Sequence, residues 1–544
     1  MRRIAALLAA LVVVFSMMPV AMAKKVPHPD KPKVLFVPHD SRPISDEQTE
    51  ATIKAIGWDI ETAPIEMLGN RENLGNPEEV WDWLEDNAQK ANIAVVSSDT
   101  LLYGSLVGSR KHDYSQHVID ERVARFREFK KINPNLKIYV FGSIMRTPRS
   151  AEASGGAEPS YYESYGSDIF RYTSLTDKQE TEGLTRREKK EYEFLGHLIP
   201  KAAMDDWLNR RNKNFAASKQ LIELEREGLF DYLALGRDDN APYSQTHMES
   251  RKLAAAGADL GPSKFQAMAG IDEFALLMLT RAVNDWTSSV PFVYVKYNWG
   301  RGGNTVPKYS DEKISESIKA HVTAAGGLIV GSQKNADFNL LVNTNPSGQT
   351  FEANDRGNDG KMREGTRYFA DLVQESVASG KPTCVADIAY ANGADNAMME
   401  ELKKRGLLFK LRAYSGWNTP TNSTGFVLSQ GMLSSKMTDD ECDKLLLTRY
   451  LDDWAYQANI RGIIGRQLGW LRASGNYSAL GDRKRAAEAR TTNFMKRFAE
   501  MNLPPFEGLE YLEVTFPWNR MFEAKFDLSK PFDFQEYKAA HGMQ

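Results

Sequence analysis

The sequence predicts an α/β fold with two Rossmann-like parallel-sheet units around a cleft, followed by a C-terminal helical region. Short runs rich in Val, Ile, Leu and Tyr alternate with helical stretches along the 544 residues, as is typical of buried parallel strands. The two halves of the chain repeat the same order of strands and helices. Most of the apolar runs end in polar residues, and in an open α/β sheet the residues past the carboxyl ends of the strands line the ligand crevice.

The first unit is expected at residues 30–290. Its strands are predicted at 34–38, 59–64, 93–97, 137–143 and 231–236, and its helices at 46–56, 77–90 and 116–131. Asn76 before Pro77, for example, combines an N-cap with a proline at the first helical position. Residues 148–230 interrupt the pattern with a Gly/Ser/Tyr-rich loop and a charged helical stretch. This insertion is expected to be either a lid beside the site or a surface excursion.

The second unit is expected at residues 291–430. Its strands are predicted at 292–297, 328–331, 338–343, 383–388 and 409–413, and its helices at 310–325, 361–379 and 394–405. Residues 431–544 are expected to be helical over about 438–470 and 479–501 and to end in a short strand pair.

A single (β/α)8 barrel is the alternative fold, built from the stronger strands alone. Two weak strands, at 59–64 and 328–331, count against it. The link from 328–331 to the strand at 338–343 is also very short, which suits a crossover in an open sheet. Two units are therefore favoured over the barrel.

The first residues predict export. Two arginines precede an apolar run that extends to Val20, and Ala21-Met22-Ala23 is a small-x-small cleavage site, so residues 1–23 are interpreted as a signal peptide. The alternative, a retained anchor helix, is disfavoured by that ending. The protein is expected to be periplasmic or secreted. No later run reaches the ~18 apolar residues of a membrane span, so none is expected after cleavage.

Composition gives no sign of a nucleic-acid-binding protein. The formal net charge is −3, whereas such proteins usually carry a basic face. Hydrophobic residues make up 42% and charged residues 26%, as in a soluble globular protein. Cys384 and Cys442 form no CxxC; two unrelated thiols are favoured, and a disulfide stays open. The sequence does not specify the oligomeric state.

Carboxylates at the strand ends are the candidate catalytic residues. Paired carboxylates in a partly dry cleft can have separated pKa values, so that one is a general acid and the other a base or nucleophile. The candidates are Asp40, Asp99, Asp238, Asp239 and Asp387. With His39 and Asn240 they could instead hold a divalent cation, although no metal site or cofactor is otherwise predicted. Any one of them could also be a helix cap or loop anchor.

Arginines, amides and aromatic side chains near the same strand ends are the candidate substrate-binding residues. Guanidinium groups bind carboxylate or phosphate bidentately, and rings beside amides suit a sugar. The candidates are Arg42, Arg146, Arg237, Asn240, Asn392, Tyr414, Trp417 and Asn418, and Arg110 lies in the same region. The structural alternative is that the arginines pair with nearby aspartates and that Trp417 packs in the core. The segment 270–273 is interpreted as an acidic helix start rather than as catalytic.

Four separated segments resemble a bacterial family catalogued only as a domain of unknown function, family 4127. They are residues 37–43, 102–110, 236–242 and 414–425, and the resemblance covers most of the mature chain. His39 and Ile271 depart from the family's pattern. The resemblance implies no activity, but it supports these segments as the site.

Export, clustered carboxylates and aromatic side chains beside amides together predict an exported hydrolase. It is expected to act on a carbohydrate or cell-envelope fragment in the interdomain cleft, as a glycosidase does. The first alternative is a non-catalytic periplasmic protein that binds a small molecule. The second is a metal-dependent hydrolase or phosphoesterase.

Overall fold

A computed structural model describes residues 31–151, 155–469 and 478–530. The predicted signal peptide, residues 1–23, lies outside the described residues. No helix within the described ranges is long and apolar enough to cross a membrane. Both cysteines, Cys384 and Cys442, are buried and carry free thiols.

Six parallel strands form the first sheet, in the order β2-β1-β3-β4-β5-β6. They are β1 (Lys33–Val37), β2 (Asp59–Thr62), β3 (Ile93–Ser97), β4 (Lys137–Ile144), β5 (Tyr232–Arg237) and β6 (Phe265–Ala269). The order 2-1-3-4-5 is that of the doubly wound, flavodoxin-like sheets. The prediction of five strands was wrong by one: β6, with the sequence Phe-Gln-Ala-Met-Ala, contains no β-branched residue and is interrupted by the polar Gln266.

Five parallel strands form the second sheet, in the order β13-β11-β9-β7-β8. They are β7 (Phe292–Tyr297), β8 (Leu328–Ile329), β9 (Phe338–Asn343), β11 (Thr383–Asp387) and β13 (Ala413–Ser415). Counted within the unit, this is again the order 2-1-3-4-5, so the predicted repeat of architecture is confirmed. The eight strands of the barrel alternative are divided between the two sheets. The last strand lies later than predicted, because a 3₁₀ turn occupies Leu408–Lys410.

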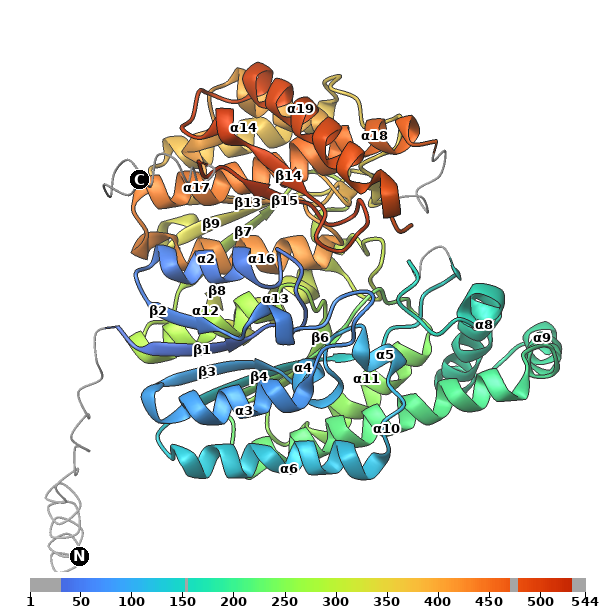
Figure 1. The fold of residues 1–544 in the computed structure, drawn as a ribbon. Coiled ribbons are helices and arrows are strands. Elements are labelled where there is room, and N and C mark those ends of the chain that lie inside the picture. The colour runs from blue at the N-terminus through green and yellow to red at the C-terminus, as the bar shows by residue number, and fades with distance from the viewer. Residues whose placement is uncertain (1–30, 152–154, 470–477, 531–544) are drawn as a thin grey trace, which may run out of the picture.

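Helices of both units fill the space between the two sheets (Figure 1). They are α2 (Glu47–Ala55), α12 (Phe274–Thr287), α13 (Ile314–Ala324) and α16 (Pro420–Leu433). One hydrophobic cluster runs through this layer, from Phe36 of β1 through Phe274 of α12 and Val427 of α16 to Phe338 of β9. The two units therefore share a core at this level.

The outer face of each sheet carries its own helices. On the first sheet these are α3 (Pro77–Asn87), α6 (Gln116–Ile132), α10 (Lys201–Arg226) and α11 (Gln245–Ala256). On the second they are α14 (Glu364–Ala378), α15 (Asn396–Lys404), α17 (Asp439–Arg449), a π-helical segment (Tyr450–Ile460), α18 (Arg461–Gln467) and α19 (Lys484–Asn502). The predicted terminal strand pair is present as antiparallel β14 (Glu513–Thr515) and β15 (Lys525–Asp527).

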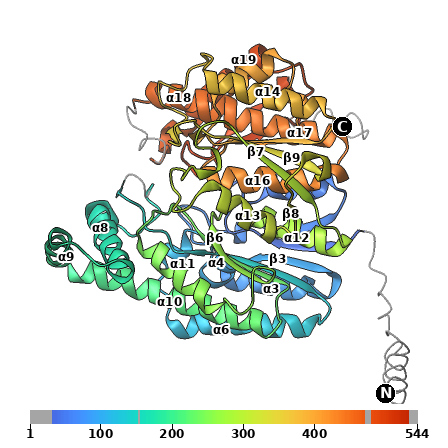
Figure 2. The ribbon, with the colours of Figure 1, turned by 180° about the vertical axis from the view of Figure 1, so that it is seen from behind.

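The insertion after β4 is an arm of three helices. These are α8 (Tyr162–Thr181), α9 (Arg186–Leu198) and the first part of α10. Opposite views of the molecule both show the arm projecting from the body (Figures 1 and 2). Its base is attached to the first unit, because Asp177 of α8 accepts hydrogen bonds from His247 and Arg251 of α11.

Candidate functional site

Loops at the carboxyl ends of the first sheet bring together a cluster of charged side chains, here named the strand-end cluster. It contains residues that follow β1, β3, β4, β5 and β6, including two from the short helices α4 (Ser98–Tyr103) and α5 (Gly108–Lys111). Its members are His39, Asp40, Arg42, Asp99, Arg110, Arg146, Glu158, Asp238, Asp239 and Asp272. All are buried except Asp239, whose side chain is 20% exposed.

Arg42 holds two buried carboxylates at the centre of this cluster. Its Nε donates to both carboxyl oxygens of Asp40, at 3.0 and 2.9 Å, and its Nη1 donates to Asp272 at 3.3 Å. The Nε2 atom of His39 lies 2.8 Å from Arg42 Nη2 and 3.3 Å from Asp272 Oδ1. Burial alone would raise the pKa of each carboxyl, but Arg42 and His39 lower it by more. The pKa values of Asp40 and Asp272 therefore lie below the usual value, and both groups are ionised.

Asp272 also connects the cluster to the second unit. The side-chain amides of Asn418 and Asn422 both donate to its Oδ2 atom, the second at 3.1 Å. Asn418 has a left-handed backbone (φ 60°), a conformation that asparagine tolerates better than most residues. The segment 270–273 was interpreted as an acidic helix start rather than as catalytic, and β6, which ends directly before it, was not predicted. With that strand in place, Asp272 would have been identified as another strand-end carboxylate.

Asp238 lies beside Arg110 in the second half of the cluster. The Nη2 atom of Arg110 donates to Asp238 Oδ2 at 3.0 Å. Burial and the neighbouring charge of Asp239 raise the pKa of Asp238 to about 7, although Arg110 opposes the shift. Asp238 is therefore a carboxyl group that can be protonated near neutral pH.

Arg146 holds the adjacent carboxylates. Its Nε and Nη2 donate to Glu158 at 2.6 and 3.1 Å, and its Nη1 donates to Asp239. Asp239 has a left-handed backbone (φ 41°), which is uncommon for a residue other than glycine. Glu158 was not predicted, because it lies in the Gly/Ser/Tyr-rich loop and follows no strand directly.

Two carboxyl groups of the cluster have a raised pKa, Asp99 and Asp238, and Asp99 is the more deeply buried of the two. Its two oxygens accept hydrogen bonds from the backbone N–H of Ser143, at 2.8 Å, and from the Ser143 hydroxyl, at 3.0 Å. Burial raises the pKa of Asp99 to about 7, and these hydrogen bonds lower it only in part. The cluster thus contains two ionised carboxylates, Asp40 and Asp272, and two carboxyl groups, Asp99 and Asp238, that titrate near neutral pH.

The fifth predicted aspartate, Asp387, lies apart from this cluster, at the carboxyl end of β11. It accepts hydrogen bonds from Asn343 at 2.9 Å, from the Asp395 backbone at 2.7 Å and from the Tyr414 hydroxyl at 3.0 Å. Burial and the charge of Asp395 raise the pKa of Asp387 to about 7. Within the described ranges no hydrogen bond joins Asp387 to the strand-end cluster. Tyr414 is fully buried, so its ring has no free face.

Two other predicted residues hold the units together near the site. Arg237 donates to Asp311 at 3.0 Å and to Glu312, both of which precede α13 of the second unit. The backbone N–H of Asn240 donates to the Tyr309 carbonyl at 3.0 Å. Arg42, Arg146 and Arg237 are thus each paired with two carboxylates, as the structural alternative expects.

Asn392 lies in the second unit, directly next to Asn418. Its backbone N–H donates to the Asn418 carbonyl at 2.7 Å, and its side chain donates to Glu352 at 2.8 Å. Glu352 belongs to β10 (Phe351–Glu352), which pairs with β12 (Tyr390–Ala391). Like Asn418, Asn392 has a left-handed backbone, with φ 61°.

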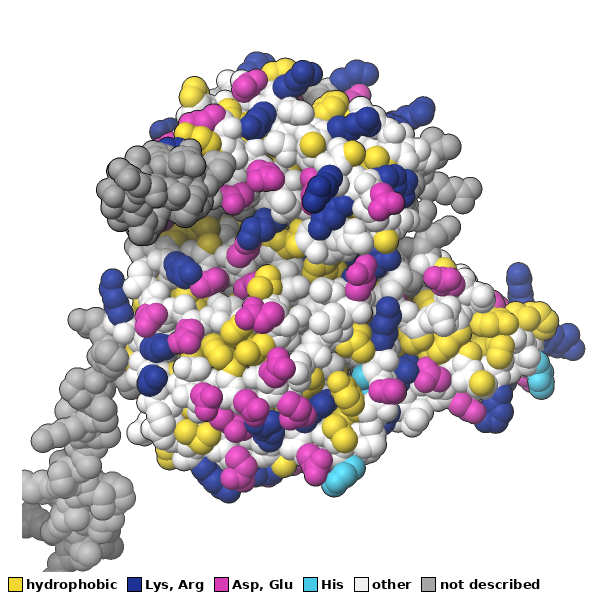
Figure 3. All heavy atoms as spheres, in the orientation of Figure 1, with side chains coloured by type: hydrophobic (Ala, Val, Ile, Leu, Met, Phe, Trp, Pro, Cys, Tyr) yellow, Lys and Arg dark blue, Asp and Glu magenta, His cyan; other side chains and the backbone are white. Residues whose placement is uncertain are grey.

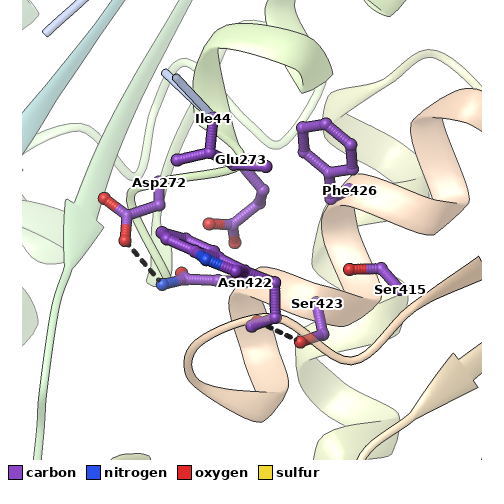
Figure 4. Close-up of a pocket in the computed structure, with 8 residues that line it drawn as sticks. Ile44, Asp272, Glu273, Ser415, Asn422, Ser423 and Phe426 are labelled. Carbon is purple, nitrogen blue, oxygen red and sulfur yellow. Dashed lines mark hydrogen bonds between the residues drawn. The ribbon is translucent and has the colours of Figure 1, made fainter. Parts of the chain in front are cut away.

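A small pocket between the two units adjoins Asp272. Figure 4 shows the Asp272 carboxylate and the Asn422 amide on one side of it. Its lining residues are Ile44, Asp272, Glu273, Ser415, Trp417, Asn422, Ser423 and Phe426. Trp417 also packs with Ile44, Leu276, Phe426 and Phe522. The ring of Trp417 is therefore a wall of this pocket and part of the core.

The side-chain arrangement that a metal ion requires is absent from the described residues. No set of three or more His, Cys, Asp or Glu side chains there is arranged to hold a metal ion.

Comparisons with known proteins give one match. The model of a family described as "Protein of unknown function (DUF4127)" matches residues 34–527. No curated protein and no solved structure matches the chain.

Proposed function

Because the chain belongs to the DUF4127 family, whose description names no activity, we propose its function from the site itself. The protein is a hydrolase that acts on a carbohydrate or cell-envelope fragment with the carboxyl groups of the strand-end cluster. Export is part of the proposal and rests on the signal peptide predicted at residues 1–23.

The observation that carries the proposal is that one cluster contains carboxyl groups with lowered pKa values and a carboxyl group with a raised pKa. Arg42 keeps Asp40 and Asp272 ionised, whereas burial and the charges of Asp239 and Asp272 raise the pKa of Asp238 to about 7. Carboxyl groups whose environments separate their pKa values are the usual acid and base of glycoside hydrolysis.

In this proposal Asp238 is the general acid and Asp239 the general base. Asp238 gives its proton to the leaving oxygen as the bond to that oxygen breaks. Asp239, the most exposed carboxylate of the cluster, accepts a proton from the attacking water. Asp272 is unsuited to the role of base, because Arg42, Asn418 and Asn422 already occupy its oxygens.

The remaining candidates have supporting roles. Arg42 and Arg146 position the carboxylates rather than bind an anionic substrate, because both are paired. The side-chain amides of Asn392 and Asn418 donate to Glu352 and Asp272, so in this proposal only their side-chain oxygens accept hydrogen bonds from the hydroxyl groups of a sugar.

A non-catalytic binding protein is the second candidate. The observation that favours it is the pairing of Arg42, Arg146 and Arg237 with two carboxylates each, which is also what a rigid binding site needs.

The test is a product assay on the purified protein with defined oligosaccharides and peptidoglycan fragments. Mass spectrometry would detect the addition of one water across the cleaved bond. We expect turnover that falls by at least about 100-fold in the Asp238→Asn, Asp239→Asn double variant. The control is Asp259→Asn, which changes an exposed carboxylate paired with Arg226.

Three outcomes would contradict the proposal. Activity that survives in the double variant overturns the roles of both residues. Binding of an oligosaccharide without turnover identifies a binding protein. Turnover that is lost on chelation, with metal detected by elemental analysis, identifies the metal-dependent alternative.

A further inference from the structure

The tip of the arm is a basic helix with exposed apolar residues. Leu195 of α9 is buried, and Ile199, the residue that follows the helix, belongs to the hydrophobic cluster of the arm. Phe194 is 62% exposed and Leu198 is 44% exposed. Residues four apart lie on the same face of a helix, so these two side chains form one small apolar surface. Figure 3 shows hydrophobic side chains next to Lys and Arg at the end of the arm.

Four basic side chains lie in the turns of α9 that precede this apolar surface. Arg186, Arg187, Lys189 and Lys190 are all exposed, and none forms an ion pair with another described residue. Arg187 and Lys190 precede Phe194 at helical spacing, so they share its face. Two of the three acids of α9 are paired within the arm, Glu188 with Lys178 and Glu191 with Arg171, whereas the third, Glu193, is exposed.

We propose that α9 docks on a membrane surface that contains anionic lipids. Basic side chains beside exposed Phe and Leu are the features of helices that lie in the bilayer interface. Each Lys or Arg near an anionic bilayer contributes about 1 kcal/mol to binding, so four of them suffice for reversible attachment.

The small size of the surface favours a bilayer over a protein partner. A 13-residue helix is about 20 Å long, and one face of it is far smaller than the ~800 Å² per partner that a stable protein interface buries. A bilayer needs only insertion of the two apolar side chains and attraction of the cations. Docking of α9 on a bilayer is expected whether or not the protein is a hydrolase.

Docking by α9 would also place the site near the membrane. The arm leaves the first sheet at the carboxyl end of β4, and the loop that leads to it carries Arg146 and Glu158 of the strand-end cluster. The cluster therefore lies at the base of the arm that would be attached.

The test is flotation of the purified protein with phosphatidylcholine vesicles, with and without phosphatidylglycerol. We expect binding only with phosphatidylglycerol, weakened by added salt. Binding should fall at least about tenfold in Lys189→Glu, Lys190→Glu and in Phe194→Ser, Leu198→Ser. The matched control is Arg485→Glu, Arg490→Glu, two exposed arginines of α19. Far-UV circular dichroism checks that each variant is folded.

Several results would overturn the proposal. One is the absence of wild-type binding to phosphatidylglycerol vesicles. Another is binding that the α9 variants keep, or that the α19 control also loses. Self-association in sedimentation experiments that only the Phe194→Ser, Leu198→Ser variant abolishes would identify a second copy as the partner of this surface.

Discussion

Arg42 stabilises more buried charge than any other single residue described at the site. Its guanidinium is the shared partner of Asp40 and Asp272, which are both buried and ionised. Removing one partner of a buried ion pair leaves an uncompensated charge, which costs far more than the pair contributes.

We therefore expect Arg42→Met to lower the free energy of unfolding by about 3–5 kcal/mol at neutral pH. Urea denaturation measures this change. The control is Arg127→Met, because Arg127 pairs with Glu227 at an exposed site and should contribute less than about 1 kcal/mol. Equal losses in the two variants would contradict the role given to Arg42.

The raised pKa of Asp99 predicts how stability depends on pH. Its pKa is about 7 in the folded protein, whereas the ordinary pKa of an aspartate is 3.8, so the folded state holds the proton more tightly. The contribution of Asp99 is then fully present below about pH 4 and is lost as the pH rises to about 7.

Asp99→Asn should remove this pH dependence. Asparagine can keep both hydrogen bonds to Ser143, because its oxygen accepts from the N–H and its amide donates to the hydroxyl. Above pH 7 the variant should be more stable than the wild type by on the order of 4 kcal/mol, and at pH 4 the two should be equal. Asp86→Asn, at an exposed position, is the control for pH-dependent melting. A parallel pH dependence in wild type and Asp99→Asn would contradict this account.

Four aspartates of the strand-end cluster were predictable from the sequence because each follows a strand. Asp40, Asp99, Asp238 and Asp239 each follow a recognisable apolar strand, so topology alone places them at one edge of the sheet. The distant partner of Arg42 could not be predicted in the same way. Arg42 and Asp272 are 230 residues apart, and no periodicity shows which loops meet.

At the scale of elements, the strongest strands and helices were predictable and the weakest were not. The alternating apolar runs and capping signals located most elements, including α3 with Asn76 as its N-cap. Strand β6 was missed because its residues have low strand propensity, and pairing with β5 stabilises it. Because β6 was not predicted, Asp272 was interpreted as part of an acidic helix start and not as a strand-end carboxylate.

The surroundings of Gly425 in α16 show how closely the helices between the two sheets, here called the middle layer, are packed. An added Cβ at Gly425 would lie 2.4 Å from Glu273 Cγ and 3.0 Å from His321 Nδ1. Glu273 and His321 form a buried pair at 3.1 Å, so neither side chain can move without losing its partner.

Gly425→Ala should therefore destabilise the protein by about 1–3 kcal/mol, despite the better helix propensity of alanine. The matched change is Gly196→Ala in α9, where the added Cβ meets only Tyr172, at 3.4 Å. That variant should be neutral or more stable by up to about 1 kcal/mol. Thermal melting compares the stabilities of the two variants. If Gly425→Ala is stabilising, the packing around Gly425 accommodates a methyl group and this account is wrong.

At the scale of the whole molecule, the two units are expected to unfold together. The shared cluster contains residues of both sheets, and polar contacts between the units add to it: Gln430 of α16 donates to Thr52 of α2 at 3.2 Å, and Arg449 of α17 donates to Gln48. A unit that unfolded alone would expose the apolar face that its partner covers.

We expect one calorimetric transition, with equal calorimetric and van't Hoff enthalpies. Because Gly425 lies in the layer that both units share, Gly425→Ala should lower the midpoint of this transition without splitting it. Residues 31–290 expressed alone should bind hydrophobic dyes and lack a cooperative transition, since α12 would lose its contact with α16. Two resolved transitions in the wild type would show instead that each sheet is an independent domain and that the middle layer is an interface.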